Sequence, residues 1–381
     1  MTNSPTAPSV DHPAGDHLAV DGLGSDDREY SDPASDPGAQ WLNPHWVEPF
    51  RRVFSLCQAR SDEAIVVLGE SGGQIRNRAL ARLALEQLDL PYRELTLPAT
   101  PIPAGPIIRS TGASLALDGQ IAAVEQLCQA DFIIDLTIEG LMHTRATGQI
   151  LGSGARILNI SNEHPETLAR LVPVEDDKGE VKGAIAQCRA ANTMAVRSEA
   201  GTDLLVDLAK TPCVGIWGWT DRPGTLAHWP GGIVVCFPPA NSVNGTIVLA
   251  PGDINLTFKR YLESAVKLTI KNDFVVDIDG SGADAQLMRR YLSGFDEADA
   301  YATSHVGWGL NRRARYEALT MYDKSQTNGT ELRALAGNFL YSTGSNEFAR
   351  RFTRGHFDLP VMNCDILLDD EWVVRSGEVV S

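Results

Sequence analysis

Short apolar runs alternate with helical patterns between residues 64 and 171, and this alternation constrains the fold more than any other feature of the chain. The β-branched run AIVVL at 64–68 is followed by the loop GESGG and the amphipathic segment QIRNRALARLALEQL. The runs DFIIDL and ARILNIS come later, each flanked by a helical pattern. Repeated strand and helix units predict a mostly parallel sheet covered by helices.

The pattern changes near residue 200, where segments typical of antiparallel strands begin. GGIVVCFPP and NGTIVLAPG predict strands, and AVKLTI and FVVDIDG predict a hairpin around KND. GADAQLMRRYLSGF predicts a helix, and CDILLDDEWVVRSGEVV predicts another hairpin. The predicted fold class is α/β plus α+β, with a parallel α/β domain over residues 41–200 and a β-rich domain over residues 201–381.

Composition narrows the classes of partner. Residues 1–40 carry eight acidic groups against one arginine, which predicts a disordered acidic tail. The net charge of −16 and the lack of a basic stripe argue against nucleic acid and anionic membranes, and no apolar run is long enough to span a bilayer. The six cysteines contain no C-x-x-C pair, which indicates free thiols in the cytoplasm. A small-molecule partner is therefore favoured.

The tripeptide His356-Phe357-Asp358 is the first candidate metal site. In a strand, residues i and i+2 point to the same face, so both side chains can reach one point. A third ligand from elsewhere would complete a two-histidine, one-carboxylate set with open positions on iron(II). An H-x-D pair alone is also compatible with an ordinary strand histidine beside an unrelated aspartate.

Three further segments carry candidate site residues. His305 in ATSHVGWGLNRRARY lies among small residues, where the pattern predicts a change from helix to loop. LAGNFLYSTGSNEF, with Ser342, predicts a pocket-lining loop. His143 follows the strand FIIDL at the end where open α/β sheets bind ligands, and His228 lies in a turn-rich loop. Either histidine could be a general acid or base, or an ordinary loop residue.

Five segments, in this order and spacing, resemble the 2,5-dihydroxypyridine 5,6-dioxygenases of bacterial nicotinic acid degradation. They are PGTLAHWPGG, GTIVLAPGDI, SHVGWGLNRRARY, GNFLYSTGSN and HFDLPVMNCDILLDD. The resemblance implies an Fe(2+)-dependent, extradiol-like enzyme that opens a hydroxylated pyridine ring with O2. It also implies a homo-oligomer. That family is related in turn to the M29-type metallo-aminopeptidases.

Carried over by position, the resemblance implies His305, His356 and Asp358 as iron ligands. It implies His143, His228 and Ser342 as catalytic residues. One position departs from the family pattern: Ile216 stands where the family has a pocket glutamate. We therefore expect ring substituents that differ from those of 2,5-dihydroxypyridine.

Two alternatives to a dioxygenase are compatible with parts of the sequence. Two histidines and a carboxylate also describe a catalytic zinc site, so a metal-dependent aminopeptidase or amide hydrolase is the first. The absence of an H-E-x-x-H motif weakens it. The second is a binding protein without catalysis, which would require five candidate site histidines and carboxylates to be vestigial.

Overall fold

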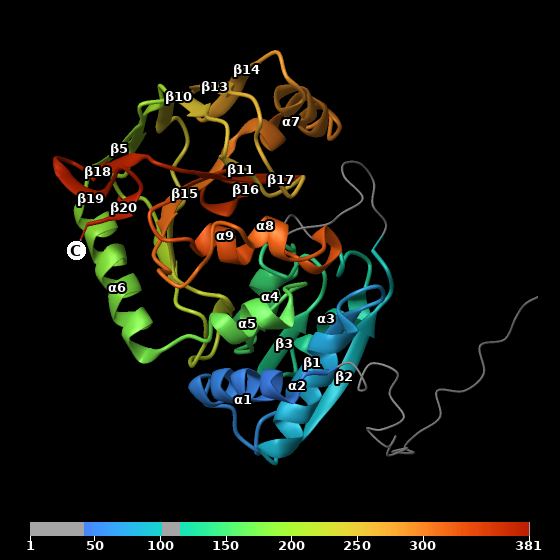
Figure 1. Ribbon diagram of the computed structural model, residues 1–381. Helices are drawn as coiled ribbons and strands as arrows, with labels where there is room; N and C mark the ends of the chain where they lie inside the picture. Colours follow the sequence, from blue (N-terminus) through green and yellow to red (C-terminus); the bar gives the residue numbers. More distant parts are fainter. Residues whose placement is uncertain (1–41, 101–114, 381) are drawn as a thin grey trace, which may run out of the picture.

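The computed structural model describes residues 42–100 and 115–380, so the predicted acidic tail lies outside the described residues. Figure 1 shows a parallel sheet and its helices at one end of the molecule and antiparallel strands at the other. The predicted fold class, α/β plus α+β, is confirmed. In the part of the chain that is described, no helix is long and apolar enough to cross a membrane.

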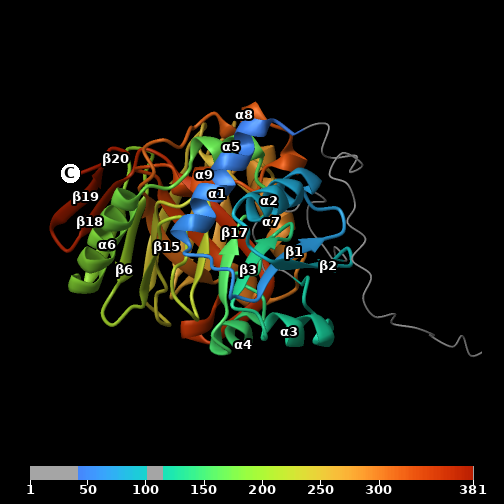
Figure 2. The same ribbon diagram turned by 90° about the horizontal axis from the view of Figure 1, so that it is seen from below.

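The parallel sheet has the strand order β2-β1-β3-β4-β8. Its members are β1 (Ile65–Glu70), β2 (Tyr92–Leu97), β3 (Phe132–Leu136), β4 (Arg156–Asn159) and β8 (Leu226–His228). Every residue of β1, β3 and β4 is buried, as expected for strands covered on both faces. The carboxyl ends of β3, β4 and β8 therefore meet at one edge of the sheet. Figure 2 shows the same arrangement from below.

Helices fill the connections as the periodicity predicts. They are α1 (Val47–Leu56), α2 (Ile75–Gln87), α3 (Ile121–Leu127), α4 (Thr147–Gly152), α5 (Pro165–Arg170), α6 (Glu175–Ala190), α7 (Ala283–Ser293), α8 (Ala318–Met321) and α9 (Thr330–Ala334). The chain starts α6 with three acidic residues, and Asp177 accepts a hydrogen bond from the Val174 amide at 2.9 Å. Negative charge at this end stabilises the helix dipole.

Two larger antiparallel sheets form the rest of the core. The long sheet contains β14 (Phe274–Asp279), β13 (Val266–Lys271), β10 (Val243–Leu249), β6 (Asp203–Asp207), β5 (Thr193–Arg197), β18 (Asp365–Leu368), β19 (Glu371–Arg375) and β20 (Glu378–Val379). The second, called the site sheet below, contains β17 (Arg351–Val361), β16 (Phe339–Asn346), β15 (Thr303–Gly309), β9 (Ile233–Cys236) and β7 (Cys213–Ile216). A small ribbon joins β11 (Ile254–Asn255) and β12 (Arg260–Tyr261).

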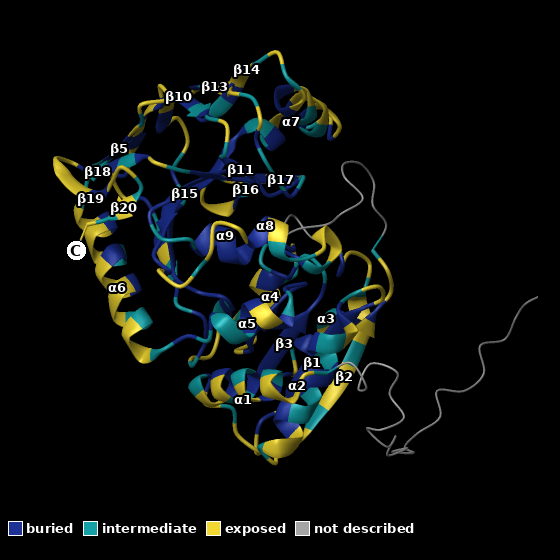
Figure 3. Ribbon diagram, in the orientation of Figure 1, coloured by how far each residue is buried: buried dark blue, intermediate teal, exposed yellow. Residues whose placement is uncertain are grey.

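Side-chain alternation gives the site sheet two different faces. Val306, Tyr341 and Phe357 belong to one apolar core with residues of the long sheet and α6. Neighbouring residues of a strand point to opposite faces, so His305, Ser342 and His356, which adjoin these three residues, point to the other face of the sheet. That face is directed toward the parallel sheet, and Figure 3 shows how deeply β15, β16 and α9 are buried there.

Two local predictions for this sheet are wrong. His305 lies in β15 and Ser342 in β16, where loops were expected, and both strands are almost wholly buried. The glycines that suggested loops serve close strand packing instead. A Cβ at Gly307 would collide with the Val234 carbonyl of β9, so glycine is required for this pairing.

The boundary expected near residue 200 stays a prediction. The hairpin of β5 and β6 pairs with β18 and β10, which come from the second half of the chain. Conversely, β8 from the second half pairs with β4 of the parallel sheet. Strands near the boundary thus connect the two regions.

Buried polar contacts hold α9 against the loop after β4. The carboxylate of Glu163 accepts hydrogen bonds from the backbone amides of Thr330 at 2.6 Å and Asn328 at 3.3 Å. Arg170 forms a bidentate pair with Glu331, both contacts being 2.8 Å. Because both carboxylates are buried, these pairs fix the position of α9 relative to the parallel sheet.

Asp273, in the β13–β14 turn, offers a test of the antiparallel core. Its buried carboxylate accepts three backbone hydrogen bonds from residues 241–243 and pairs with Arg351 at 2.6 Å. We expect Asp273→Asn to lower the free energy of unfolding by about 3–5 kcal/mol, because it leaves a buried arginine without its anion. Urea unfolding measures this change. Asp277→Asn, on the exposed face of β14, is the matched control and should change stability by less than about 0.5 kcal/mol. If the two variants lost equal stability, the buried ion pair of Asp273 with Arg351 would not stabilise the core as we expect.

Candidate metal centre and active site

The structure brings His305, His356 and Asp358 together from two strands. His356 and Asp358 lie on one face of β17, as the H-x-D spacing predicts, and His305 comes from β15. Oδ1 of Asp358 is 3.2 Å from His356 Nε2 and 3.9 Å from His305 Nε2. All three side chains are buried. The three proposed ligands therefore converge on one point.

His143 joins this group from the other side. It lies after the carboxyl end of β3, and its ring is 4.5 Å from the His356 ring between centroids. One ring nitrogen from each of His143, His305 and His356 lies within 4.8 Å of the other two. Two overlapping donor sets are thus present, one with His143 and one with Asp358.

The carboxylate of Asp358 is held by two further side chains. Arg333 of α9 donates from Nε to Oδ2 at 2.5 Å, and the Ser342 hydroxyl donates to Oδ1. Burial alone would raise the pKa of this carboxyl, but His356, Arg333 and His305 hold its pKa well below the usual range. Asp358 is therefore an anion. Ser342 contacts Asp358 and is absent from the cavity wall described below.

His228 is the last residue of β8, so the turn-rich loop expected for it is wrong, because the segment pairs with β4 of the parallel sheet. Its tautomer is defined by a contact with the backbone. Its Nδ1 lies 2.7 Å from the Pro230 carbonyl oxygen, which can only accept, so Nδ1 carries the proton. Nε2 is then a free acceptor. Burial lowers the pKa of His228 to about 4 and that of His305 to about 3, so both imidazoles are neutral near pH 7.

A cavity of about 220 Å³ lies between the site sheet and the parallel sheet. The polar part of its lining contains the four histidines and Asp358, with Asn159, Ser161, Thr330 and Arg333. The apolar part, called the apolar wall below, is formed by Val214, Ile216, Leu226, Ile233, Val235 and Leu340. A water molecule occupies roughly 30 Å³. The space is therefore suited to a single ring with small substituents and not to a peptide.

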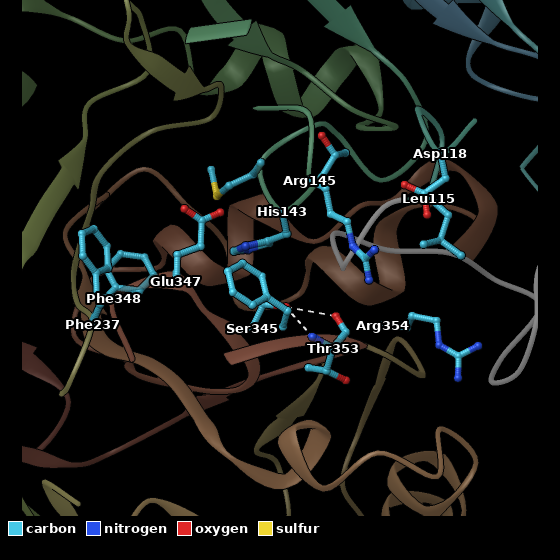
Figure 4. Close-up of a pocket in the computed structure, with 13 residues that line it drawn as sticks. Leu115, Asp118, His143, Arg145, Phe237, Ser345, Glu347, Phe348, Thr353 and Arg354 are labelled. Carbon is cyan, nitrogen blue, oxygen red and sulfur yellow. Dashed lines mark hydrogen bonds between the residues drawn. The ribbon is translucent and has the colours of Figure 1, made fainter. Parts of the chain in front are cut away.

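A second, outer chamber of about 570 Å³ shares Met142, His143 and Phe237 with the inner cavity. Figure 4 shows His143 between its two sides, with Phe237 and Phe348 on one side and Arg145 and Arg354 on the other. The Phe237 and Phe348 rings are 5.3 Å apart between centroids. His143 thus lies where the two spaces meet.

The inner donor set fits a divalent cation. Among the residues that the structure describes, Nδ1 of His305 and Nδ1 of His356 are buried without a hydrogen-bond partner, which is costly for a ring nitrogen in a low-dielectric environment. Either ring nitrogen of each histidine could hold a cation. Neutral imidazoles and one carboxylate are the ligands that iron(II), zinc and related ions take from proteins. These residues therefore form a candidate metal site.

Sequence reasoning did not identify Arg333. It lies in TELRALAG among apolar neighbours. Nothing in that pattern indicates that this helical residue pairs with Asp358, 25 residues later on a strand. Phe237 and Asn159 were also missed. Their place at the carboxyl end of a buried strand is the only available signal, since Asn159 is the last residue of β4 and Phe237 follows β9.

Fold and site together define a mixed α/β protein in which buried histidines and a carboxylate form a candidate metal site near the carboxyl edge of a parallel sheet. A family model of 2,5-dihydroxypyridine 5,6-dioxygenases matches residues 45–381. A Pseudomonas putida KT2440 protein of that name is 36% identical over 343 residues, covering 89% of this chain and 97% of its own. The chain therefore belongs to the 2,5-dihydroxypyridine 5,6-dioxygenase family.

Solved structures agree with this placement. The structure of 2,5-dihydroxypyridine dioxygenase from Pseudomonas putida KT2440 aligns with a TM-score of 0.82 at 36% identity, covering 88% of this chain and 97% of that one. AmpT from Thermus thermophilus aligns with a TM-score of 0.58 at 13% identity, covering 88% and 99%. At that identity the second likeness concerns the fold alone.

The contact between Arg333 and Asp358 generates a stability prediction. We expect Arg333→Met to destabilise the metal-free protein by about 3–5 kcal/mol, because a buried carboxylate loses its cation. Arg333→Met combined with Asp358→Asn should recover part of the loss. Denaturant unfolding with and without added metal measures both. Arg197→Met, which removes an exposed pair, is the control. A single variant as stable as its control would contradict a buried ion pair.

Proposed function

We propose that this protein is an iron(II)-dependent dioxygenase that opens a hydroxylated pyridine-type ring with O2. The observation that supports this proposal most strongly is the buried group of His305, His356 and Asp358 beside a cavity the size of a single ring. The chain also belongs to the 2,5-dihydroxypyridine 5,6-dioxygenase family. We further propose that it acts in catabolism in the cytoplasm as a homo-oligomer. The six free cysteines favour a reducing compartment.

His305, His356 and Asp358 would hold the metal. Iron(II), when bound there, supplies open positions for small ligands and a redox centre. Ser342 and Arg333 orient the carboxylate, and with it the ligand set. The apolar wall offers no hydrogen-bond partner to water, so it favours a ring over solvent in the cavity.

His228 and His143 have different positions for proton transfer. His228 presents Nε2 as an acceptor and is neutral, so it can take the proton of a ring hydroxyl. The resulting oxyanion is electron-rich, which favours attack by oxygen on the ring. His143 contacts both the inner cavity and the outer chamber, so it can exchange protons with solvent during turnover. Assistance of this kind contributes typically 10²–10⁴-fold.

The function and the ligand set can be tested in one experiment. Protein loaded anaerobically with iron(II) should consume O2 in step with the loss of ring absorbance when dihydroxypyridines are added. His356→Ala should lose both bound iron and turnover, because a ligand is removed. His143→Ala should keep iron and lose turnover by roughly 10²–10⁴-fold. Iron content and oxygen uptake are measured on the same samples.

The outcomes separate the alternatives. His164→Ala, a change at the N-cap of α5, is the control and should retain iron and activity. Iron-loaded, fully active His356→Ala would remove the assignment of the ligand. Loss of iron from His143→Ala would favour the three-histidine donor set. Amide cleavage by a zinc-loaded sample without any oxygen uptake would support the hydrolase.

The apolar wall predicts which ring edge the substrate presents. Ile216, 8% exposed, belongs to this wall, so we expect a C–H or alkyl edge to face it. Ile216→Val removes one methylene and should shift the ratio of kcat/KM toward an alkylated hydroxypyridine by roughly tenfold. Ile121→Val, an exposed isoleucine outside the cavity, should leave the ratio unchanged. A carboxylated ring preferred over an alkylated one would contradict the assignment of the wall.

A further inference from the structure

A cluster of three cysteines lies behind the active-site wall. Cys188 comes from α6, Cys213 from β7 and Cys236 from β9, and the three sulfur atoms lie within 4.8 Å of one another. All are buried free thiols. They point to the core face of the site sheet, the opposite side from Val214 and Val235 of the cavity. The proposed ring-opening reaction makes no use of them.

Cys213 and Cys236 face each other across two antiparallel strands. They are direct partners in the β7–β9 register. The next pair is joined by a hydrogen bond from the Phe237 amide to the Pro212 carbonyl at 2.9 Å, so the cysteines occupy a non-hydrogen-bonded position. Cα atoms at such positions are about 4.5 Å apart, inside the range that a disulfide spans. The two sulfur atoms are already only 3.0 Å apart.

The surroundings favour a reactive thiolate at Cys213. Hydrogen bonds from the Cys188 and Cys236 thiols lower its pKa, and the nearby Arg189 guanidinium acts in the same direction. The pKa values of Cys188 and Cys236 are raised, so these remain protonated donors. A thiolate is the form that attacks peroxide or a disulfide. In addition, β7 is the edge strand of its sheet, which shortens the path from solvent.

We propose that Cys213 and Cys236 form a dithiol site that a peroxide converts to a cross-strand disulfide. The Cys213 thiolate attacks one oxygen of hydrogen peroxide, the O–O bond breaks, and a sulfenic acid and hydroxide form. The Cys236 sulfur then attacks the sulfenic sulfur and displaces water. Two thiols and one peroxide give one disulfide and two waters, and the two electrons pass from sulfur to peroxide.

The disulfide would link the edge strand β7, which carries part of the apolar wall, covalently to β9. Val214 and Ile216 of β7 and Val235 of β9 line the cavity, each one or a few residues from the bridge. An external dithiol can reduce the bridge by two successive thiol–disulfide exchanges, which return both cysteines to thiols and leave the dithiol oxidised to its own disulfide. The site is thus a reversible modification site and acts on the wall without using a metal ligand.

Thiol counting after peroxide treatment tests the proposal on the full-length protein. The fully reduced chain has six thiols. We expect four after mild peroxide treatment and denaturation, a Cys213–Cys236 peptide by mass spectrometry, and recovery of six with dithiothreitol. The midpoint of thermal unfolding should rise by several degrees in the oxidised form.

Three variants make the result specific. Cys213→Ser, which removes the attacking thiolate, should retain all five of its thiols after treatment. Cys364→Ser, also a buried cysteine, is the matched control and should fall from five to three. Cys188→Ser should still form the Cys213–Cys236 bridge. The proposal is overturned if no bridge forms while other thiols oxidise, or if the bridge contains Cys188. A thiophilic cation that copurifies with the protein and is lost in Cys188→Ser would also overturn it.

Discussion

The buried carboxylate of Asp358 is the group on which the rest of the site depends. A carboxylate at this depth must be paired, and here Arg333 and Ser342 satisfy it from α9 and β16 while it belongs to β17. Arg333 keeps its place because α9 is fastened to the parallel sheet through Glu163 and Glu331. The geometry of the metal centre therefore depends on the junction of both regions of the chain.

Local patterns were sufficient for much of the fold. Three of the parallel strands (β1, β3 and β4), the β13–β14 and β18–β19 hairpins and the shared face of His356 and Asp358 follow from periods of two and 3.6 residues, which the chain carries within each segment. The strands β2 and β8 were not predicted. The same reasoning failed for β15 and β16. Their glycines look like loop signals, whereas Gly307 is required by the carbonyl of a strand some seventy residues earlier.

The sequence could name His305, His356 and Asp358 as candidate ligands, a role that stays a prediction, but not the side-chain contacts that hold Asp358 in place. His305, His356 and Asp358 have side chains whose chemistry indicates a metal, and a resemblance in register located them. Arg333 and Ser342 carry no such signal, because their role is set by which carboxylate they meet in three dimensions. The same limit applies to Cys213 and Cys236, whose 23-residue separation gives no hint that they are cross-strand partners.

Charge balance connects the metal site to the substrate. Asp358 and Arg333 form an ion pair, and His228 and His305 are neutral, so these four side chains together carry no net charge. A bound divalent cation would leave this buried region strongly positive, and low dielectric makes that costly unless an anion enters with the substrate. A ring hydroxyl that loses its proton to Nε2 of His228 supplies that anion inside the cavity. The apolar wall, which includes Ile216, then contacts only uncharged parts of the ring. The polar residues bind the oxyanion, and the apolar residues enclose the ring.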